Sequence, residues 1–242
     1  MKLGQRIRRA VLRQVLPPPI DGEHVVYSMI GSAVDEPSRP SERLLSLGLE
    51  AAAIAARSRL DVVTRAGQPI DRMNLWPGEH YRLLAGLVTL LKPSLIVEVG
   101  TGSGASAVAM KQALPPNGKI VTFDLIDWPH APEGILRPEH FVDKRLEHSC
   151  DDVTSDDGWA KHRPLFERAD LFFIDAAKDG VMEQRLIDRM RAAQRRAPAI
   201  VVFDDIRLWN MLRIWRQLPW PKLDLTSFGH WTGTGLAEWS GV

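Results

Sequence analysis

The stretch Ile96-Val97-Glu98-Val99-Gly100-Thr101-Gly102-Ser103-Gly104 joins a short apolar run to a loop that contains three glycines. Because a helical pattern over 105–114 follows it, the run predicts a buried strand that turns into a helix. Glycines at such a turn let the backbone approach a ligand closely, and the helix N-terminus offers free N–H groups. The stretch therefore predicts a nucleotide-like site at the carboxyl end of a parallel strand.

The rest of the C-terminal part repeats this alternation of strand and helix. Apolar runs over 95–99, 120–123, 171–174 and 200–203 predict strands, and residues 181–195 and 205–218 carry helical patterns. Such alternation predicts βαβ units in a doubly wound, mostly parallel sheet of the α/β class. The tail, 222–239, alternates and contains several glycines, which predicts an antiparallel C-terminal hairpin.

The N-terminal part is expected to be a helical extension. Helices are predicted over 3–16, 41–57 and 79–91, with mostly loop over 20–40. We therefore divide the chain into an extension, residues 1–78, and a cofactor-binding domain, residues 79–242. The basic amphipathic pattern of residues 1–16 allows contact with a membrane surface, although packing against protein is the favoured interpretation.

Composition excludes several classes of function. The chain has 242 residues and a formal net charge of +1, so no overall basic field favours nucleic acid as a partner. Its single cysteine, Cys150, excludes an internal disulfide and a cysteine-based zinc cluster and suits a reducing cytoplasm. No apolar run approaches the ~20 residues of a membrane span.

The glycine pattern by itself fits two cofactors. Gly100, Gly102 and Ala105 also satisfy the dinucleotide fingerprint, so an NAD(P)-dependent oxidoreductase remains an alternative. Glu98, inside the strand end, favours S-adenosylmethionine, because a carboxylate suits the cationic methionine end and repels a pyrophosphate. Asp124 follows the second strand, where either cofactor would have its ribose-binding acid.

Residues from about Glu79 to the end resemble class I S-adenosylmethionine-dependent methyltransferases. The resemblance implies a Rossmann-like, seven-stranded sheet with the antiparallel tail hairpin. Within that class, Phe173-Ile174-Asp175-Ala176-Ala177-Lys178-Asp179 and Val201-Val202-Phe203-Asp204-Asp205 resemble the metal-dependent O-methyltransferases, such as the catechol and caffeoyl-CoA enzymes. The expected cofactor-binding residues are Glu98, Gly100, Thr101, Gly102, Ser103, Gly104, Ser106, Asp124, Leu125, Asp151 and Asp175, with Asp151 near the adenine amino group.

The same resemblance implies a divalent metal, expected to be Mg²⁺, at Asp175, Asp204 and Asp205. Related enzymes have an asparagine at the third position, so Asp205 adds a negative charge, and it would otherwise cap the helix that follows. Lys178 matches the lysine that helps to deprotonate the acceptor, a role that requires a lowered pKa.

Without a metal, His230 is the best candidate for the general base, because glycines frame it in the tail. The spacing of His80, His130, His140, His148 and His162 is not typical of a metal cluster.

The sequence thus predicts an O-methyltransferase that acts on a hydroxyl of a small-molecule or glycan-like acceptor. The expected catalytic residues are Asp175, Lys178 and His230. A homodimer is the expected assembly. A cofactor-binding subunit without catalytic activity is the non-enzymatic alternative, since a fold alone does not fix a function.

Overall fold

The computed structural model describes residues 39–65, 68–195 and 197–241. The helix predicted over 3–16 and most of the loop predicted over 20–40 lie outside the described residues.

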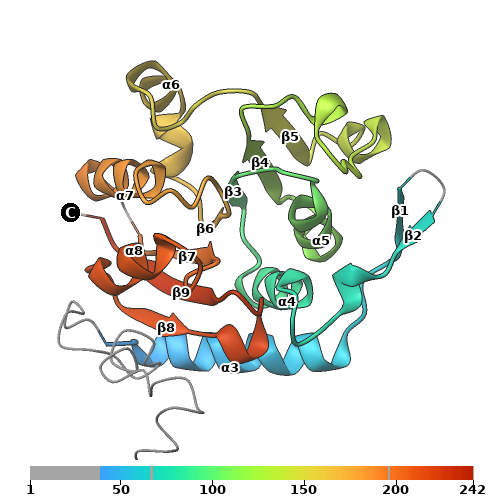
Figure 1. Cartoon of the computed structure of the whole chain (residues 1–242), viewed down its shortest axis with the longest axis horizontal. Coiled ribbons are helices and arrows are strands. Elements are labelled where there is room, and N and C mark those ends of the chain that lie inside the picture. The colour runs from blue at the N-terminus through green and yellow to red at the C-terminus, as the bar shows by residue number, and fades with distance from the viewer. Residues whose placement is uncertain (1–38, 66–67, 196, 242) are drawn as a thin grey trace, which may run out of the picture. The chain divides into compact units, whose positions relative to one another are not determined.

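A seven-stranded sheet with the order β5-β4-β3-β6-β7-β9-β8 forms the centre of this part of the chain (Figure 1). Strands β3 to β7 run parallel to one another, whereas β9 runs antiparallel to both β7 and β8. The predicted α/β fold, its mostly parallel sheet and its antiparallel C-terminal hairpin are therefore confirmed. The strands are β3 (Leu95–Val99), β4 (Lys119–Phe123), β5 (Leu146–Ser149), β6 (Leu171–Ile174), β7 (Ala199–Asp204), β8 (Lys222–Asp224) and β9 (Thr234–Trp239).

Helices cover both faces of the sheet, so two apolar cores form. Because successive side chains of a strand point to opposite faces, β3 gives Ile96 to one core and Val97 to the other. Each fully buried apolar side chain stabilises the fold by roughly 1.5–3 kcal/mol. Helices α3 (Glu42–Arg57), α4 (Tyr81–Leu91) and α5 (Ala105–Ala113) contribute to the first core, and α6 (Asp156–Phe166), α7 (Met182–Ala192) and α8 (Met211–Gln217) contribute to the second.

The strand order places a crevice beside β3. From β3 the chain proceeds outward to β4 and β5, and it then returns to the opposite side of β3 to form β6 and β7. The loops that leave β3 and β6 therefore diverge at the carboxyl ends of these strands. In open α/β sheets, ligands bind at such a switch point.

Helix α8 begins at Met211, so the prediction of a helix from Asp205 was wrong for 205–210. Asp205 and Trp209 have φ angles of 57° and 46°, left-handed values that an α-helix cannot contain. A turn replaces the first part of the predicted helix, and Asp205 lies in it.

Two elements of the sheet domain have weak sequence signals. Strand β5 lies at the sheet edge, where only Leu146 is fully buried, so it lacks a continuous apolar run. Helix α6 contains Gly158 and Pro164 and many charged residues, and Ser155 caps it by accepting a hydrogen bond from the Gly158 N–H. A separate antiparallel hairpin, β1 (Val63–Arg65) and β2 (Gln68–Ile70), precedes α4.

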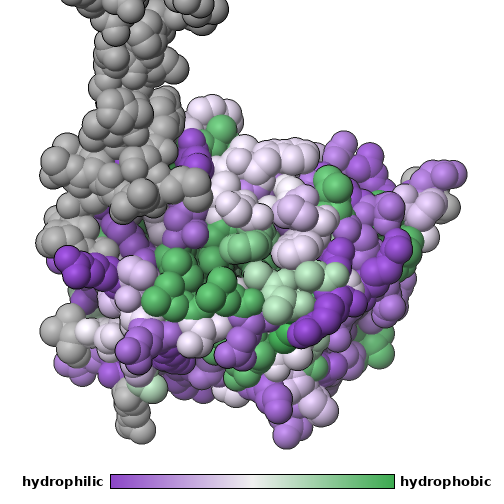
Figure 2. Space-filling view, turned by 90° about the horizontal axis from the view of Figure 1, so that it is seen from below, coloured by the Kyte–Doolittle hydropathy of each residue, from purple (hydrophilic) through white to green (hydrophobic). Residues whose placement is uncertain are grey.

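Figure 2 views the molecule from the side of α3 and shows apolar residues gathered on this face. On α3 itself, the side chains of Leu45 and Leu49 are exposed. Among the described residues, no helix is both long and apolar enough to cross a membrane.

Gly100→Ala tests the closest backbone approach in the fold. A Cβ at residue 100 would lie 1.9 Å from the carbonyl oxygen of Asp175, and φ at this residue is +99°. We expect a loss of about 3 kcal/mol or more in the free energy of unfolding, measured by urea denaturation. The matched control is Gly102→Ala, whose Cβ would meet nothing within 4 Å and whose φ of +50° costs about 1 kcal/mol. Equal unfolding midpoints for the two variants would contradict this account.

Candidate active site

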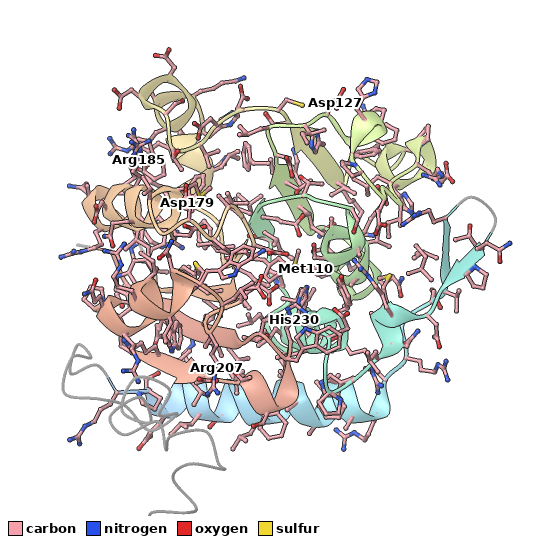
Figure 3. All side chains as sticks on the ribbon, viewed as in Figure 1. Met110, Asp127, Asp179, Arg185, Arg207 and His230 are labelled. Carbon is pink, nitrogen blue, oxygen red and sulfur yellow. The ribbon has the colours of Figure 1, made fainter. Side chains whose placement is uncertain are left out.

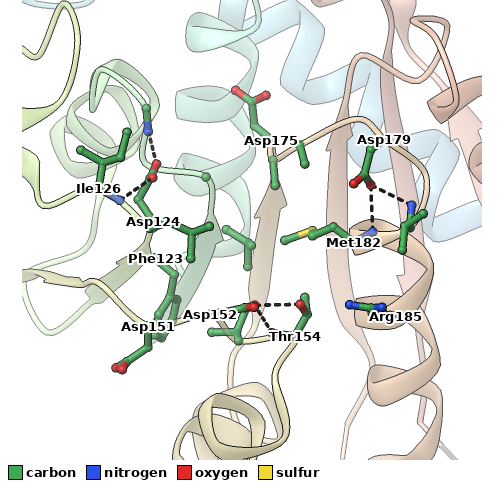
Figure 4. A pocket seen from close by; sticks show the side chains of 18 residues that line it. Phe123, Asp124, Ile126, Asp151, Asp152, Thr154, Asp175, Asp179, Met182 and Arg185 are labelled. Carbon is green, nitrogen blue, oxygen red and sulfur yellow. Dashed lines mark hydrogen bonds between the residues drawn. The ribbon is translucent and has the colours of Figure 1, made fainter.

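A cavity of about 570 Å³ lies at the carboxyl ends of β3, β4 and β6 (Figure 4). This volume is within the usual range for small-molecule sites. Four segments form its wall, namely the glycine loop after β3, the chain after β4, the chain after β5 and the connection from β6 into α7. The lining residues are Val99, Gly100, Gly102, Phe123, Asp124, Leu125, Ile126, Asp151, Asp152, Val153, Thr154, Asp175, Ala176, Ala177, Asp179, Val181, Met182 and Arg185.

The cavity brings together about half of the predicted cofactor residues. Those that line it are Gly100, Gly102, Asp124, Leu125, Asp151 and Asp175. The remaining ones, Glu98, Thr101, Ser103, Gly104 and Ser106, are not among the lining residues.

Sequence reasoning missed the part of the wall that the start of α7 contributes. The Asp179 carboxylate accepts hydrogen bonds from the backbone N–H groups of Val181 and Met182 at 2.8 and 2.9 Å (Figure 4). Arg185 lies one turn further along the helix and also faces the cavity. The signal for these residues was available, because a predicted helix directly after a strand of the same sheet edge places its first turn at the site.

The glycine loop is tied to the end of β4. The N–H groups of Gly100 and Thr101 both donate to the Phe123 carbonyl oxygen, at 2.8 and 3.1 Å. The Gly102 N–H donates to Asp124 Oδ2 at 2.9 Å, and the Ile126 N–H donates to Asp124 Oδ1 at 3.1 Å. The Asp124 carboxylate is thereby fixed in the cavity wall, and each oxygen keeps a lone pair for a ligand hydroxyl.

Asp151 is held by three side chains at the far end of the cavity. It accepts hydrogen bonds from Lys161 Nζ at 2.8 Å, from Ser149 Oγ at 2.6 Å and from His162 Nε2 at 2.7 Å. These donors, Lys161 above all, hold the pKa of the Asp151 carboxyl below its ordinary value. Asp151 is therefore an ionised acceptor at the position expected for an amino group of the ligand.

Glu98 is completely buried in β3. Burial raises the pKa of its carboxyl to about 7, against the opposing effect of the Ser106 hydroxyl, which donates a hydrogen bond to Oε1. The other oxygen, Oε2, has no hydrogen-bond partner among the described residues. Glu98 thus lies behind the cavity wall with one acceptor available.

An acid cluster lies beside the cavity, where β6 and β7 end. Ligand oxygens of Asp175, Asp204 and Asp205 lie within 4.8 Å of one another. Burial, followed by the charge of Asp204, raises the pKa of the Asp175 carboxyl. Asp175 also lines the cavity, so the cluster and the cavity share this residue.

Lys178 bridges two of these acids. Its Nζ donates to Asp175 Oδ1 and lies 2.9 Å from Asp205 Oδ2. Burial alone would lower the pKa of Lys178, but the two carboxylates outweigh burial and raise it. Lys178 is therefore a cation in this arrangement, whereas proton removal from an acceptor requires a lowered pKa.

His230 reaches the cluster from the turn that precedes β9. Its Nδ1 lies 3.2 Å from both Asp204 Oδ2 and Asp205 Oδ1. Burial opposes the charged form, but these carboxylates raise the pKa of His230 to about 10. At neutral pH the ring is a donor, which weighs against its role as a metal-free general base.

His80 completes the cluster, although its sequence context gave no sign of this. It is the residue directly before α4, and Figure 3 shows His230 beside this helix. The two imidazole rings lie 5.4 Å apart in an edge-to-face arrangement, and His80 Nδ1 lies 3.2 Å from Asp204 Oδ1.

Comparison with known proteins shows what part of the chain is similar to. Residues 97–206 match a family model described as a methyltransferase domain. This segment, a little under half of the chain, is therefore similar to a methyltransferase domain. The match agrees with the predicted methyltransferase and disfavours the alternative of a dinucleotide-dependent oxidoreductase.

Two solved structures share the fold of this chain. A methyltransferase from Podospora anserina, bound to S-adenosylhomocysteine, has a TM-score of 0.50 at 18% identity and covers 66% of this chain and 77% of its own. An O-methyltransferase from Bacillus cereus, also in complex with S-adenosylhomocysteine, has a TM-score of 0.50 at 18% identity and covers 83% of this chain and 92% of its own.

The residues present fit the groups that the family implies. The cavity offers a glycine loop and the fixed carboxylate of Asp124 to a nucleoside. The acid cluster offers oxygen ligands of the type that Mg²⁺ prefers. Asp204 Oδ1 is buried and lies 3.2 Å from His80 Nδ1 without meeting hydrogen-bond geometry, so it keeps acceptor capacity for a cation.

The raised pKa of Glu98 predicts a pH-dependent stability. Between its ordinary pKa of 4.5 and about 7, the unfolded chain releases this proton while the folded protein keeps it. Stability therefore falls as pH rises through this window. Glu98→Gln keeps the acceptor for Ser106 but cannot ionise. As pH rises from 4.5 to 7, we therefore expect the free energy of unfolding of the variant to rise relative to that of the native protein, by up to about 3 kcal/mol, measured by urea denaturation. A difference between Glu98→Gln and the native protein that stays the same from pH 4.5 to 7 would refute the assignment.

Proposed function

We propose that this methyltransferase transfers the methyl group of S-adenosylmethionine to a hydroxyl oxygen of a small-molecule or glycan-like acceptor, assisted by a divalent cation such as Mg²⁺. The observation that carries the proposal is that Asp175 belongs to both the cavity wall and the acid cluster. An acceptor oxygen held at the cluster would therefore face a cofactor bound in the cavity. The name of the Bacillus cereus structure, an O-methyltransferase, agrees with this choice of acceptor atom.

The cofactor would occupy the 570 Å³ cavity. Asp124 would accept hydrogen bonds from the ribose hydroxyls, and Asp151 would accept one from the adenine amino group. Glu98, behind the wall, would face the cationic methionine end with Oε2, which lacks a hydrogen-bond partner in the described part of the chain. The backbone and side chains of the loop and of the first turn of α5 would complete the site, through Gly100, Thr101, Gly102, Ser103, Gly104, Ser106 and Leu125.

The reaction requires alignment and the removal of one proton. A C–S bond breaks, a C–O bond forms, and the acceptor hydroxyl loses its proton. The cofactor supplies a reactive sulfonium methyl group, and a divalent cation lowers the pKa of a hydroxyl bound to it. Asp175, Asp204 and Asp205 would position the acceptor through that cation.

Lys178 would receive the proton of the acceptor. In the present arrangement two carboxylates keep this lysine protonated. Its role therefore requires that Asp175 and Asp205 release their ion pairs with it when they engage a metal. Until then Lys178 neutralises these acids and prevents their mutual repulsion.

We also propose a homodimer that works in the cytoplasm, with residues 1–78 as a helical extension of the cofactor domain, residues 79–242. Cys150 is free and exposed, which suits a reducing compartment. The exposed Leu45 and Leu49 on α3 support an interface on that side.

Asp124→Asn tests the cofactor site. The asparagine amide lacks the charge that strengthens hydrogen bonds to ribose. We therefore expect S-adenosylhomocysteine to bind at least about 10-fold more weakly, measured by calorimetry. Asp157→Asn, on an exposed turn of α6, is the matched control and should bind like the native protein. Absence of S-adenosylhomocysteine binding by the native protein at high micromolar concentration would overturn the proposed function.

Metal removal tests the acceptor site. We expect exhaustive chelation to lower methyl transfer to a panel of hydroxyl acceptors by about 100-fold or more, with recovery when a divalent cation is restored. Asp175→Asn should lower turnover similarly, whereas exposed Asp188→Asn should not. Turnover that survives both chelation and Asp175→Asn would remove the metal from the mechanism and leave the cofactor assignment intact.

A further inference from the structure

We propose that His80 and His230 join Asp204 as protein ligands of the divalent cation, so that the site takes a transition-metal ion in preference to Mg²⁺. This inference rests on the proposed function for the presence of a cation, and it changes the ligand set and the class of metal. The carboxylate trio predicted from the sequence shares only Asp204 with it.

His80 is the first observation. Its side chain is 3% exposed, Nε2 has no hydrogen-bond partner among the described residues, and Nδ1 has only an ion-pair contact with Asp204 that does not meet hydrogen-bond geometry. A buried polar group without a partner costs roughly 1–3 kcal/mol, and such groups are rare in folded proteins. A bound cation would explain why a buried imidazole nitrogen next to other ligating groups has no hydrogen bond.

The geometry between His80 and Asp204 is the second observation. Asp204 is 2% exposed, and its Oδ1 also lacks a hydrogen bond although His80 Nδ1 lies 3.2 Å away. The two atoms are thus close without the alignment of a donor and an acceptor. With metal–ligand bonds of about 2.0–2.2 Å, neighbouring ligands of one ion lie roughly 3.0–3.4 Å apart, which matches this separation.

His230 supplies the third ligand and contacts the other carboxylate oxygen of Asp204. Its Nδ1 lies 3.2 Å from Asp204 Oδ2, and one ligand atom each of His80, Asp204 and His230 lies within 4.8 Å of the others. The rings meet edge to face, with an interplanar angle of 84°. The three residues come from three separate elements, namely the start of α4, the end of β7 and the turn before β9.

In the alternative ligand set of Asp175, Asp204 and Asp205, Lys178 already balances part of the negative charge. Lys178 donates to Asp175 and lies 2.9 Å from Asp205, so two of the three acids have a cation beside them. Asp204 has no lysine or arginine partner among the described ion pairs and faces the two imidazoles. A metal cation would therefore be repelled least by Lys178 if it bound between Asp204, His80 and His230.

Ligand chemistry decides the class of metal. Mg²⁺ prefers oxygen ligands and gives up its water reluctantly, whereas imidazole suits zinc, iron and related first-row ions. Two histidines and one carboxylate leave coordination positions open, which is the arrangement of catalytic rather than structural sites. An acceptor hydroxyl could take such a position beside Asp175 and the cofactor cavity.

Co²⁺ titration of the metal-free protein, followed by visible absorption, tests the ligand set without using activity. The experiment is performed on a Cys150→Ser background, because Asp127, His148 and Cys150 form a second group that could bind this ion. We expect one Co²⁺ site, displaced by Zn²⁺, and Mg²⁺ binding at least about 100-fold weaker in calorimetry.

Variants then separate the two ligand sets. His80→Leu and His230→Ala should each weaken Co²⁺ binding by more than about 100-fold, since even partners outside the ligand shell are worth 10–100-fold. Asp175→Asn should change it only a few-fold, and exposed His130→Leu is the matched histidine control. Circular dichroism checks that each variant folds. If His80→Leu does not fold, Co²⁺ binding by His230→Ala still tests the inference, because His230 is partly exposed.

The outcomes are distinct. Loss of Co²⁺ binding in Asp175→Asn but not in His80→Leu or His230→Ala would overturn the inference in favour of the carboxylate trio. Absence of Co²⁺ and Zn²⁺ binding, or tighter binding of Mg²⁺, would also overturn it and identify the cluster as an ion-pair network. S-adenosylhomocysteine binding, measured in parallel, reports on the proposed function independently.

Discussion

The approach of Gly100 to the backbone of Asp175 is the constraint on which the site depends. The Asp175 N–H donates to the Val99 carbonyl oxygen at 2.9 Å, and a Cβ at residue 100 would lie 1.9 Å from the Asp175 carbonyl oxygen. Only glycine allows the loop after β3 to pass so close to the end of β6. Because of this contact, the cavity and the acid cluster share one wall, and the distance between them is set by backbone rather than by mobile side chains.

A second constraint explains how two consecutive aspartates reach the same cluster. Successive side chains of a strand point to opposite faces, so Asp204 and Asp205 would diverge if β7 continued. The strand ends at Asp204, and the left-handed φ of Asp205 turns the chain. Both carboxylates then lie 3.2 Å from His230 Nδ1. The local strain of a non-glycine residue in this conformation is thus offset by the ion pairs that it permits.

The sequence predicted those parts of the site that depend on local pattern. Apolar runs predicted the strands, and the spacing of glycines and acids predicted the cavity wall at Gly100, Gly102 and Asp124, which the structure brings together. The turn at 205–210 was missed, because a left-handed residue other than glycine leaves no mark in helical periodicity. His80 was missed for a different reason. It is 150 positions from His230, and only the packing of α4 against the sheet brings the two rings together.

In the proposed mechanism, charge balance would link the cation, the lysine and the acceptor. Asp175, Asp204 and Asp205 are faced by Lys178, His80 and His230, so three acids meet three bases in a largely buried space. A divalent ion bound by two neutral imidazoles would replace two protons, which leaves the charge of the cluster unchanged. If Asp175 or Asp205 then turned toward the ion, Lys178 would lose the partners that keep it protonated. Its pKa would fall, and it could accept the proton of a hydroxyl beside it. In this arrangement the metal and the base are coupled, because the same carboxylates cannot fully serve both.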